Sequence, residues 1–356
     1  LDGFALGADI RDLTPLSGRI GGGEFAVFTL GSLPQAGTLM LTQGSELRLA
    51  GRLKYRLIEG ESWGRYPTGG KGYFQDPTPG AANGARPRRQ VVISEINYHP
   101  QSGDDRDEFI ELHNSGQAPV DLSGWRFESG IGYEFAAGLV LEPGGYLLVV
   151  PDAARAASLY GGAAVAGDYA GRLSDKSERI VLVDALGREI ADFHYADDGG
   201  WPRAADGPAC APDPNYPAET CGAGMTLELR HPGLEPDSGG AWVAETVGGT
   251  PGRGRVRPED DPAPAIYQCG YDPALPAPGE AVRFTARALC PTGVKSVAVK
   301  WRYSDDPVWR TVPLADDGAG GDEEAGDARW TGFLTDADRG GTIVWHCAAE
   351  SLTGID

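Results

Sequence analysis

Residues 91–96 read Val-Val-Ile-Ser-Glu-Ile, and residues 108–112 read Glu-Phe-Ile-Glu-Leu. Both runs are short, rich in β-branched and large apolar side chains, and bounded by Asn, Pro, Gly and Asp. Similar runs return at residues 146–150 (YLLVV), 179–183 (RIVLV) and 282–288 (VRFTARA). Many such runs, separated by turn-forming residues, predict an all-β chain built of sandwiches rather than of a parallel sheet.

One segment of the chain has helical periodicity. Residues 152–160 (DAARAASLY) place apolar side chains three and four residues apart, and Asp152 stands where an N-cap is expected. The spacing predicts one short helix. No apolar run approaches the roughly 20 residues of a membrane-spanning helix, so we expect no membrane span.

Two stretches of the sequence correspond to each other in the same internal order. Residues 122–127 (LSGWRF) match residues 1–6 (LDGFAL), and residues 142–150 (EPGGYLLVV) match residues 20–28 (IGGGEFAVF). This order indicates two copies of one unit.

The second copy opens about 30 residues earlier than the first, with the predicted strands of residues 91–121. We therefore expect the first copy, residues 1–84, to be a sandwich without its opening strands. Upstream sequence of the same polypeptide, or strand addition by a neighbouring chain, would supply them. The remaining alternative is that the first copy is stable as a smaller sheet.

Four motifs occur in the order that is typical of one family: VVISEINYHP (91–100), DEFIELHN (107–114), VDLSGW (120–125) and GTPG (249–252). They resemble a lamin tail domain over residues 91–252, and more weakly over the first copy. The resemblance implies an immunoglobulin-like β-sandwich that carries no catalytic residues. In bacteria such domains occur in secreted multidomain proteins, some with spore-coat-H-like kinase domains and others with nucleases; in nuclear lamins the domain is a binding module.

The last segment resembles a fibronectin type III or immunoglobulin-like module. Residues 265–273, 282–288, 294–303 and 342–349 predict its strands, and we expect it to lack a final strand. The predicted organisation is therefore a partial lamin-tail-like sandwich (1–84), a linker (85–90), a complete lamin tail domain (91–252), a second linker (253–264) and a C-terminally incomplete fibronectin type III or immunoglobulin-like domain (265–356).

The five cysteines indicate an oxidising compartment. Cys210 and Cys221 bracket a Pro-rich loop without periodicity, which predicts a disulfide between them. Cys269, Cys290 and Cys347 allow one further pair and one free thiol, and the sequence leaves the choice open. None of the cysteines has zinc-binding spacing. We expect an extracellular, cell-surface or periplasmic protein.

Residues 316–327 (DDGAGGDEEAGD) place oxygen ligands in a Gly-rich loop. Calcium takes six to eight oxygen ligands in irregular geometry, so Asp316, Asp317, Asp322 and Asp327 are candidate calcium ligands. The alternative is a plain solvated hairpin loop. Residues 104–108 (DDRDE) form a second acidic cluster, where calcium is the less favoured reading. Apart from this possible calcium, we expect no cofactor.

Catalytic motifs are not found. Residues 237–240 (DSGG) resemble the nucleophile motif of trypsin-like proteases, but no histidine has a matching context, and in the repeat they form a turn before Trp242. The sequence therefore predicts no catalytic and no cofactor-binding residue, and a protein that is not an enzyme.

Nucleic acid is an unlikely partner by charge. The net charge is −20, and residues 91–250 carry 26 acidic and 9 basic residues. Phosphate neutralisation would need the opposite balance. The two linkers, residues 85–90 and 253–264, contain several Arg and Pro residues. We expect them to be solvated connectors rather than a binding patch for an anionic polymer.

The tryptophans are expected to fill the cores rather than to form sugar-binding platforms: Trp63, Trp125, Trp201, Trp242, Trp301 and Trp309.

The leading hypothesis is a non-catalytic structural or binding segment of a larger secreted or cell-surface bacterial protein. Its partners would be further domains of the same polypeptide, a neighbouring protein chain or an extracellular polymer. One alternative is the accessory region of a secreted enzyme whose catalytic domain, a spore-coat-H-like kinase or a nuclease, lies outside this chain. A second alternative is a nucleic-acid-binding module.

Overall fold

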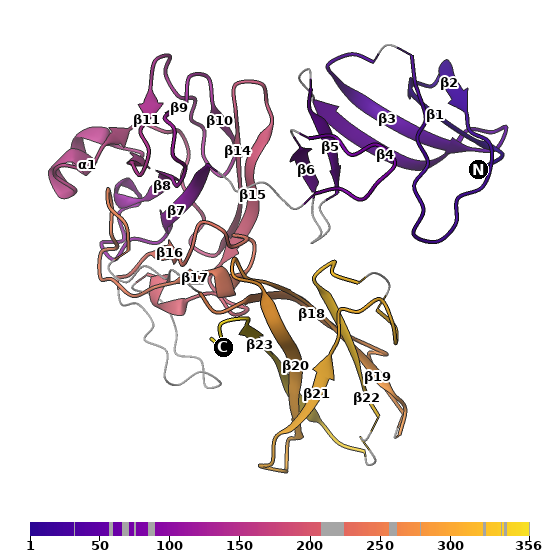
Figure 1. The fold of residues 1–356 in the computed structure, drawn as a ribbon. Helices are drawn as coiled ribbons and strands as arrows, with labels where there is room; N and C mark the ends of the chain where they lie inside the picture. Colours follow the sequence, from indigo (N-terminus) through magenta and orange to yellow (C-terminus); the bar gives the residue numbers. More distant parts are fainter. Residues whose placement is uncertain are drawn as a thin grey trace. The chain divides into compact units, whose positions relative to one another are not determined.

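The computed structural model describes residues 1–31, 33–56, 60–65, 71–74, 76–84, 90–207, 224–255, 262–277, 279–322, 325–335, 337 and 340–355. They belong to two compact units, Leu1–Pro87 and Arg88–Asp356. Strands dominate both units (Figure 1), which confirms the all-β prediction and the sandwich architecture. No helix in these described ranges is long and apolar enough to cross a membrane.

The first unit is a four-stranded antiparallel sheet with a separate hairpin. The sheet has the order β2 (Asp12–Pro15), β1 (Phe4–Asp9), β3 (Ala36–Gln43), β4 (Arg48–Arg56), and the hairpin pairs β5 (Ser62–Arg65) with β6 (Lys71–Phe74). Few of its described apolar side chains are buried, whereas Phe25 and Val27 are 57% and 63% exposed. This unit therefore has only a thin core.

Residues 20–28 form no strand, although the internal repeat matches them to residues 142–150. The corresponding stretch of the second copy forms a strand, β12 (Tyr146–Val149), because it pairs with β8 (Phe109–Asn114). No strand is formed between residues 16 and 31. The physical reason is the missing ladder: within the described part of the first unit, no strand corresponds to β8 and offers backbone hydrogen bonds to this apolar stretch.

The middle sandwich, in the second unit, packs a six-stranded sheet against a three-stranded one. The large sheet runs β13 (Val165–Ala166), β12, β8, β7 (Val91–Asn97), β16 (Leu227–Leu229), β17 (Trp242–Val243), and the small sheet runs β10 (Arg126–Ser129), β14 (Ser177–Val183), β15 (Glu189–Ala196). A short ladder joins β9 (Val120–Asp121) to β11 (Val140–Leu141), and single 3₁₀ turns lie at η1 (Asp105–Asp107), η2 (Arg203–Ala205) and η3 (Gly239–Ala241). Its core contains side chains of both sheets, such as Ile96, Ile110, Ile180 and Phe193.

The other face of the large sheet is covered in two ways. Helix α1 (Ala153–Leu159) packs Ala156 against Phe109 and Leu148. The prediction of this helix is confirmed, including its N-cap: the Asp152 carboxylate accepts a hydrogen bond from the Arg155 amide at 2.9 Å. The remainder of this face is covered by the segment 246–255, which contacts buried carboxylates described below.

The C-terminal sandwich packs two three-stranded sheets. One has the order β18 (Ala265–Asp272), β19 (Val282–Leu289), β22 (Arg329–Leu334), and the other β21 (Arg310–Leu314), β20 (Val294–Tyr303), β23 (Ile343–Ser351). The two antiparallel sheets form a β-sandwich. Along β19 the apolar side chains alternate inward, as the sequence predicted.

The tryptophans do not all behave as expected. Trp125, Trp201, Trp242 and Trp301 are buried in the sandwich cores, as predicted. The other two do not fill a core: Trp63 is only half-buried, and Trp309 is 44% exposed. It precedes the edge strand β21, and there its ring contacts the Arg302 guanidinium and His346 on the surface of the sheet instead of filling the interior.

Candidate functional site

The acidic loop of the C-terminal sandwich joins β21 to β22. The loop is closed at its base by two backbone hydrogen bonds between Ala315 and Thr331, which form an antiparallel bridge. In the closed loop, carboxylate oxygens of Asp316, Asp322 and Asp327 all lie within 4.8 Å of one another. Three of the four predicted calcium ligands are thus brought together.

Backbone amides occupy several oxygens of this cluster. The two oxygens of Asp316 accept hydrogen bonds from Gly326 at 2.7 Å and from Ala328 at 3.0 Å. Asp322 Oδ2 accepts one from Gly318 at 2.6 Å. Asp322 Oδ1 differs: it is buried and has no hydrogen-bond partner among the described residues, on a side chain that is 6% exposed. A buried carboxylate oxygen without a partner is costly, and a cation would compensate it.

The electrostatics of the loop agree with this geometry. Burial, together with the nearby carboxylates of Asp327 and Asp322, raises the pKa of Asp316 above its ordinary value. Like charges in a partly desolvated site repel one another, and a divalent ion would relieve that repulsion. Asp317 lies outside the cluster, because its Oδ1 accepts a hydrogen bond from the Ala319 amide at 2.9 Å in a local turn.

The second acidic cluster, residues 104–108, is neutralised by arginines. Asp107 receives both guanidinium contacts of Arg155, and Asp104 pairs with Arg106 at 2.7 Å. These arginines hold the pKa of Asp107 and of Asp104 below the usual range. Asp104, Asp105 and Asp107 thus have arginine partners, which makes this part of the cluster a turn-forming network of ion pairs. The buried Glu108 differs, since it accepts hydrogen bonds from the Tyr169 hydroxyl and the Leu173 amide.

Three buried glutamates form the feature that sequence reasoning missed. Glu95 on β7 lies directly opposite Glu111 on β8 and opposite Glu228 on β16, so the three side chains stand in a row across adjacent strands. All three are about 1% exposed. The signal was present in the sequence as charged residues inside strands that are otherwise apolar, but the register that aligns them is set by strands far apart in the chain. We call these residues the glutamate row.

The segment 246–252 is tied to the glutamate row by hydrogen bonds. Glu95 accepts from the Thr250 amide at 3.0 Å and from the Thr250 hydroxyl at 2.9 Å. Glu111 Oε2 accepts from the Gly252 amide at 2.6 Å. Gly249 must be glycine here, because a Cβ would lie 1.9 Å from Glu95 Oε1. The closing GTPG motif therefore lies across the glutamate row and is hydrogen-bonded to it. We call the segment 246–252 the strap.

Burial changes the protonation of the glutamate row. Desolvation raises the pKa of Glu95 to about 7 and that of Glu111 to about 8, in spite of the hydrogen bonds that favour their ionised forms. The pKa of Glu228 is also raised by burial, although Arg255 opposes the shift. Proximity within the row adds to the effect, since each carboxylate disfavours ionisation of its neighbours.

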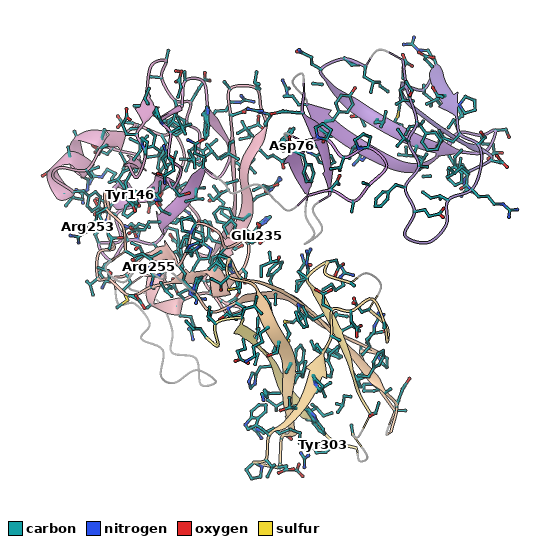
Figure 2. The ribbon with its side chains drawn as sticks, in the orientation of Figure 1. Asp76, Tyr146, Glu235, Arg253, Arg255 and Tyr303 are labelled. Carbon is teal, nitrogen blue, oxygen red and sulfur yellow. The ribbon has the colours of Figure 1, made fainter. Side chains whose placement is uncertain are left out.

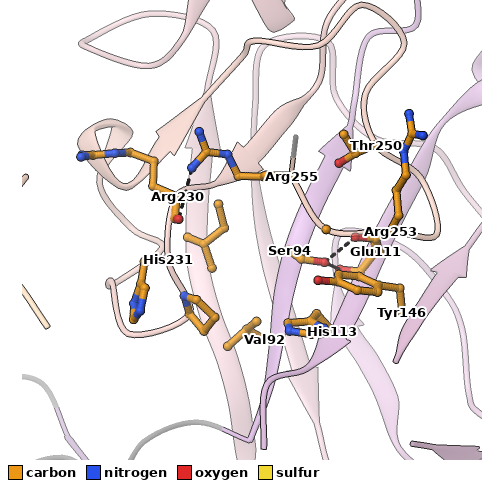
Figure 3. A pocket seen from close by; sticks show the side chains of 13 residues that line it. Val92, Ser94, Glu111, His113, Tyr146, Arg230, His231, Thr250, Arg253 and Arg255 are labelled. Carbon is orange, nitrogen blue, oxygen red and sulfur yellow. Dashed lines mark hydrogen bonds between the residues drawn. The ribbon is translucent and has the colours of Figure 1, made fainter. Parts of the chain in front are cut away.

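A pocket of about 350 Å³ lies beside the strap. Glu111 and Tyr146 line one side of it and Arg255 the other (Figure 3). His113 stacks on Tyr146 with ring centroids 4.2 Å apart, and burial lowers the pKa of His113. The pocket therefore offers a flat ring surface and polar groups on facing walls, which suits the binding of a small polar group.

Arginines at the start of the predicted linker 253–264 belong to this sandwich. Arg253 and Arg255 lie on it near Tyr146 (Figure 2), and the Arg255 side chain is only 7% exposed. Its guanidinium pairs with Glu245 at 3.0 Å and donates a hydrogen bond to the Arg230 carbonyl at 3.2 Å. The prediction of a solvated connector is therefore wrong for Arg255, because Glu245 and the Arg230 carbonyl hold its buried side chain on the sandwich and the buried Glu228 lies 4.0 Å from its Nε.

The remaining predicted sites are placed as follows. Ser238 of the DSGG motif is 4% exposed and donates its hydroxyl hydrogen bond to the Ile266 carbonyl at 3.0 Å, so it is a structural hydroxyl in a turn, as predicted. Cys210 and Cys221 lie outside the described residues. Cys269, Cys290 and Cys347 are present as thiols.

Comparison with known proteins adds one finding to the geometry. No curated protein matches the chain. Strands β7 and β8 of the six-stranded sheet, Glu95 and Glu111 of the glutamate row, and the closing strap lie in motifs on which the resemblance to a lamin tail domain was based. Residues 85–197, which include β7 through β15 of this sandwich, match the family model of the lamin tail domain.

Proposed function

We propose that the chain is a non-catalytic, calcium-stabilised structural or binding segment of a larger secreted or cell-surface bacterial protein. A lamin-tail match in an immunoglobulin-like sandwich is consistent with a binding or structural module. The observation that carries the calcium part is the closed loop in which carboxylates of Asp316, Asp322 and Asp327 lie within 4.8 Å of one another while Asp322 Oδ1 is buried without a hydrogen-bond partner among the described residues.

The chemistry of the loop favours calcium over other metals. The convergent side chains of the cluster offer carboxylate oxygen, which suits hard cations. A Gly-rich loop adapts to irregular coordination, and calcium accepts such geometry, whereas magnesium requires a near-ideal octahedron. Modules outside the cell bind calcium with dissociation constants of about 0.1–1 mM, and this range sets the calcium concentration for the test.

Titration of the full chain with calcium tests the proposal. Because the ion binds only the folded loop, 2 mM calcium is expected to raise the melting temperature of one transition by roughly 5 °C relative to a chelator. Asp322→Asn should abolish both the binding heat and this shift. Asp317→Asn is the matched control, since Asp317 lies outside the cluster, and it should retain both. Identical melts of the wild type with calcium and with chelator would refute the calcium site.

The enzyme-accessory alternative rests on no feature of the described residues. The nucleic-acid alternative is opposed by the net charge of −20. A gel shift of the full chain with duplex DNA at physiological salt is expected to show no complex, and a salt-dependent shift would favour that alternative over the one proposed.

A further inference from the structure

Two of the three cysteines of the C-terminal sandwich lie on strands of different sheets. Cys269 is on β18, an edge strand of one sheet, and Cys347 is on β23, an edge strand of the other. Although these strands share no ladder, they contact each other. The edges of the two sheets therefore meet along β18 and β23.

The aromatic contacts fix how the two strands are aligned. Tyr271 and Trp345 meet with ring centroids 5.7 Å apart. Tyr271 lies two residues after Cys269, and Trp345 lies two residues before Cys347. Side chains two residues apart on a strand point to the same face. Because β18 and β23 run in opposite directions, one step of two residues from the Tyr271–Trp345 contact leads to Cys269 on one strand and to Cys347 on the other. The Tyr271–Trp345 contact thus places Cys269 opposite Cys347.

A β-bulge directs Cys269 towards β23. The register between β18 and β19 shifts between Tyr267 and Gly270, and Gln268 has a positive φ of 53°. A bulge of this kind changes the direction in which the following side chain points. Cys347 packs against the hydrophobic core of the sandwich, and the thiols of Cys347 and Cys269 lie within hydrogen-bonding contact of each other.

Cys290 is excluded as the partner of Cys269 by position. Leu289 pairs with Ala265, so Cys290 lies beyond the start of β18, roughly 15 Å along the strand from Cys269. A disulfide needs Cα atoms within about 7 Å. The Cys290 thiol instead donates a hydrogen bond to the Pro262 carbonyl at 3.2 Å.

We propose that Cys269 and Cys347 form a disulfide that joins the edges of the two sheets, and that Cys290 is the free thiol of this sandwich. Cys269 is exposed whereas Cys347 is only partly exposed, so an oxidant reaches the Cys269 thiol first and Cys347 acts as the resolving thiol.

The oxidant is a small-molecule or protein disulfide of an extracytoplasmic compartment, such as oxidised glutathione. The Cys269 thiolate attacks one of its sulfurs and displaces one glutathione thiolate. Cys347 then loses its proton, attacks the Cys269 sulfur of the mixed disulfide and releases the second glutathione. Two protein thiols are oxidised and one glutathione disulfide is reduced to two thiols, so electrons and protons balance.

Peptide mapping of the full chain tests the pairing. Arg287 and Lys295 place the three cysteines on different tryptic peptides. After reduction, oxidation with oxidised glutathione and alkylation, the Cys269 and Cys347 peptides should be linked in the wild type and in Cys290→Ser. A link from Cys290 to either of them, or a fully alkylated Cys269, would overturn the proposal.

Thermal unfolding provides a second readout that does not depend on mapping. In a chain carrying Cys210→Ser and Cys221→Ser, reductant is expected to lower the melting temperature of the C-terminal sandwich by roughly 10–20 °C, because the bridge closes a long loop. Adding the Cys269→Ser substitution at this exposed position should remove the response to reductant. An unchanged response in that variant would contradict the bridge.

Discussion

The glutamate row should make the stability of the middle sandwich fall as the pH rises. Glu111 has a pKa of about 8 in the folded chain against an ordinary 4.5. A group whose pKa is raised by folding contributes stability that is complete below its unfolded pKa and is lost as the pH rises through the folded one. Between pH 5 and pH 8.5, ionisation of this single carboxyl costs the folded state about 3–4 kcal/mol.

Glu111→Gln isolates this contribution. The amide has the shape of the carboxyl group, so its oxygen can still accept from the Gly252 amide, and its NH₂ can donate to the Ser94 hydroxyl, which now donates to Glu111 at 2.7 Å. Because glutamine does not ionise, the variant should be less stable than or equal to the wild type at pH 5 and more stable at pH 8.5. Relative to the wild type, its free energy of unfolding should gain about 3–4 kcal/mol across this range.

Urea unfolding followed by tryptophan fluorescence, at pH 5.0, 6.5 and 8.5, measures the effect. The difference between variant and wild type belongs to the middle sandwich, since the other domains are identical in both chains. Glu142→Gln, which removes an exposed carboxylate of the same sandwich, is the matched control and should follow the wild type at every pH. If the free energy of unfolding changed with pH by the same amount in Glu111→Gln and in the wild type, the reasoning would be refuted, because Glu111 would then ionise in the folded chain at no cost.

Two further predictions concern packing and ion pairing. Trp301→Ala, at a side chain that is 1% exposed, should destabilise the C-terminal sandwich by about 3–5 kcal/mol in thermal unfolding, whereas Trp309→Ala at the surface should cost less than about 1 kcal/mol; equal losses would contradict the burial difference. Arg155→Ala should cost about 2 kcal/mol at pH 7, because it leaves the Asp107 carboxylate without its guanidinium. Arg155 lowers the pKa of Asp107, so this loss should shrink towards pH 3 in urea titrations, and a loss that is independent of pH would argue against the ion pair.

Local patterns predicted the strands well. Residues 91–96, 179–183 and 282–288 lie within β7, β14 and β19, and the predicted helix begins after its predicted N-cap. These elements are specified by periodicity over a few residues and by short-range capping. The all-β class followed directly, because the same short apolar runs recur between turn-forming residues along the chain.

Long-range register could not be predicted in the same way. Nothing near Glu95 in the sequence shows that Glu228 will lie beside it, since β16 joins β7 after more than a hundred residues. Residues 20–28, which the repeat matches to the strand-forming residues 142–150, form no strand for a related reason: an apolar stretch forms a strand only where a partner strand offers its backbone. In the acidic loop, composition predicted the cluster, but only the turn geometry separates Asp317 from Asp316, Asp322 and Asp327.

The strap over the glutamate row has a mechanical consequence. It fastens the last segment of the middle sandwich to the first strand, β7, through the hydrogen bond from Thr250 to Glu95, and to β8 through the hydrogen bond from Gly252 to Glu111, so the two ends of the domain are held close together. Tension applied to the chain on both sides of the domain would load these bonds before the core strands β14 and β15. The force needed to open the domain would therefore be set by a few amide–carboxyl contacts. In a pulling experiment on the chain, release of the strap would be the first unfolding event.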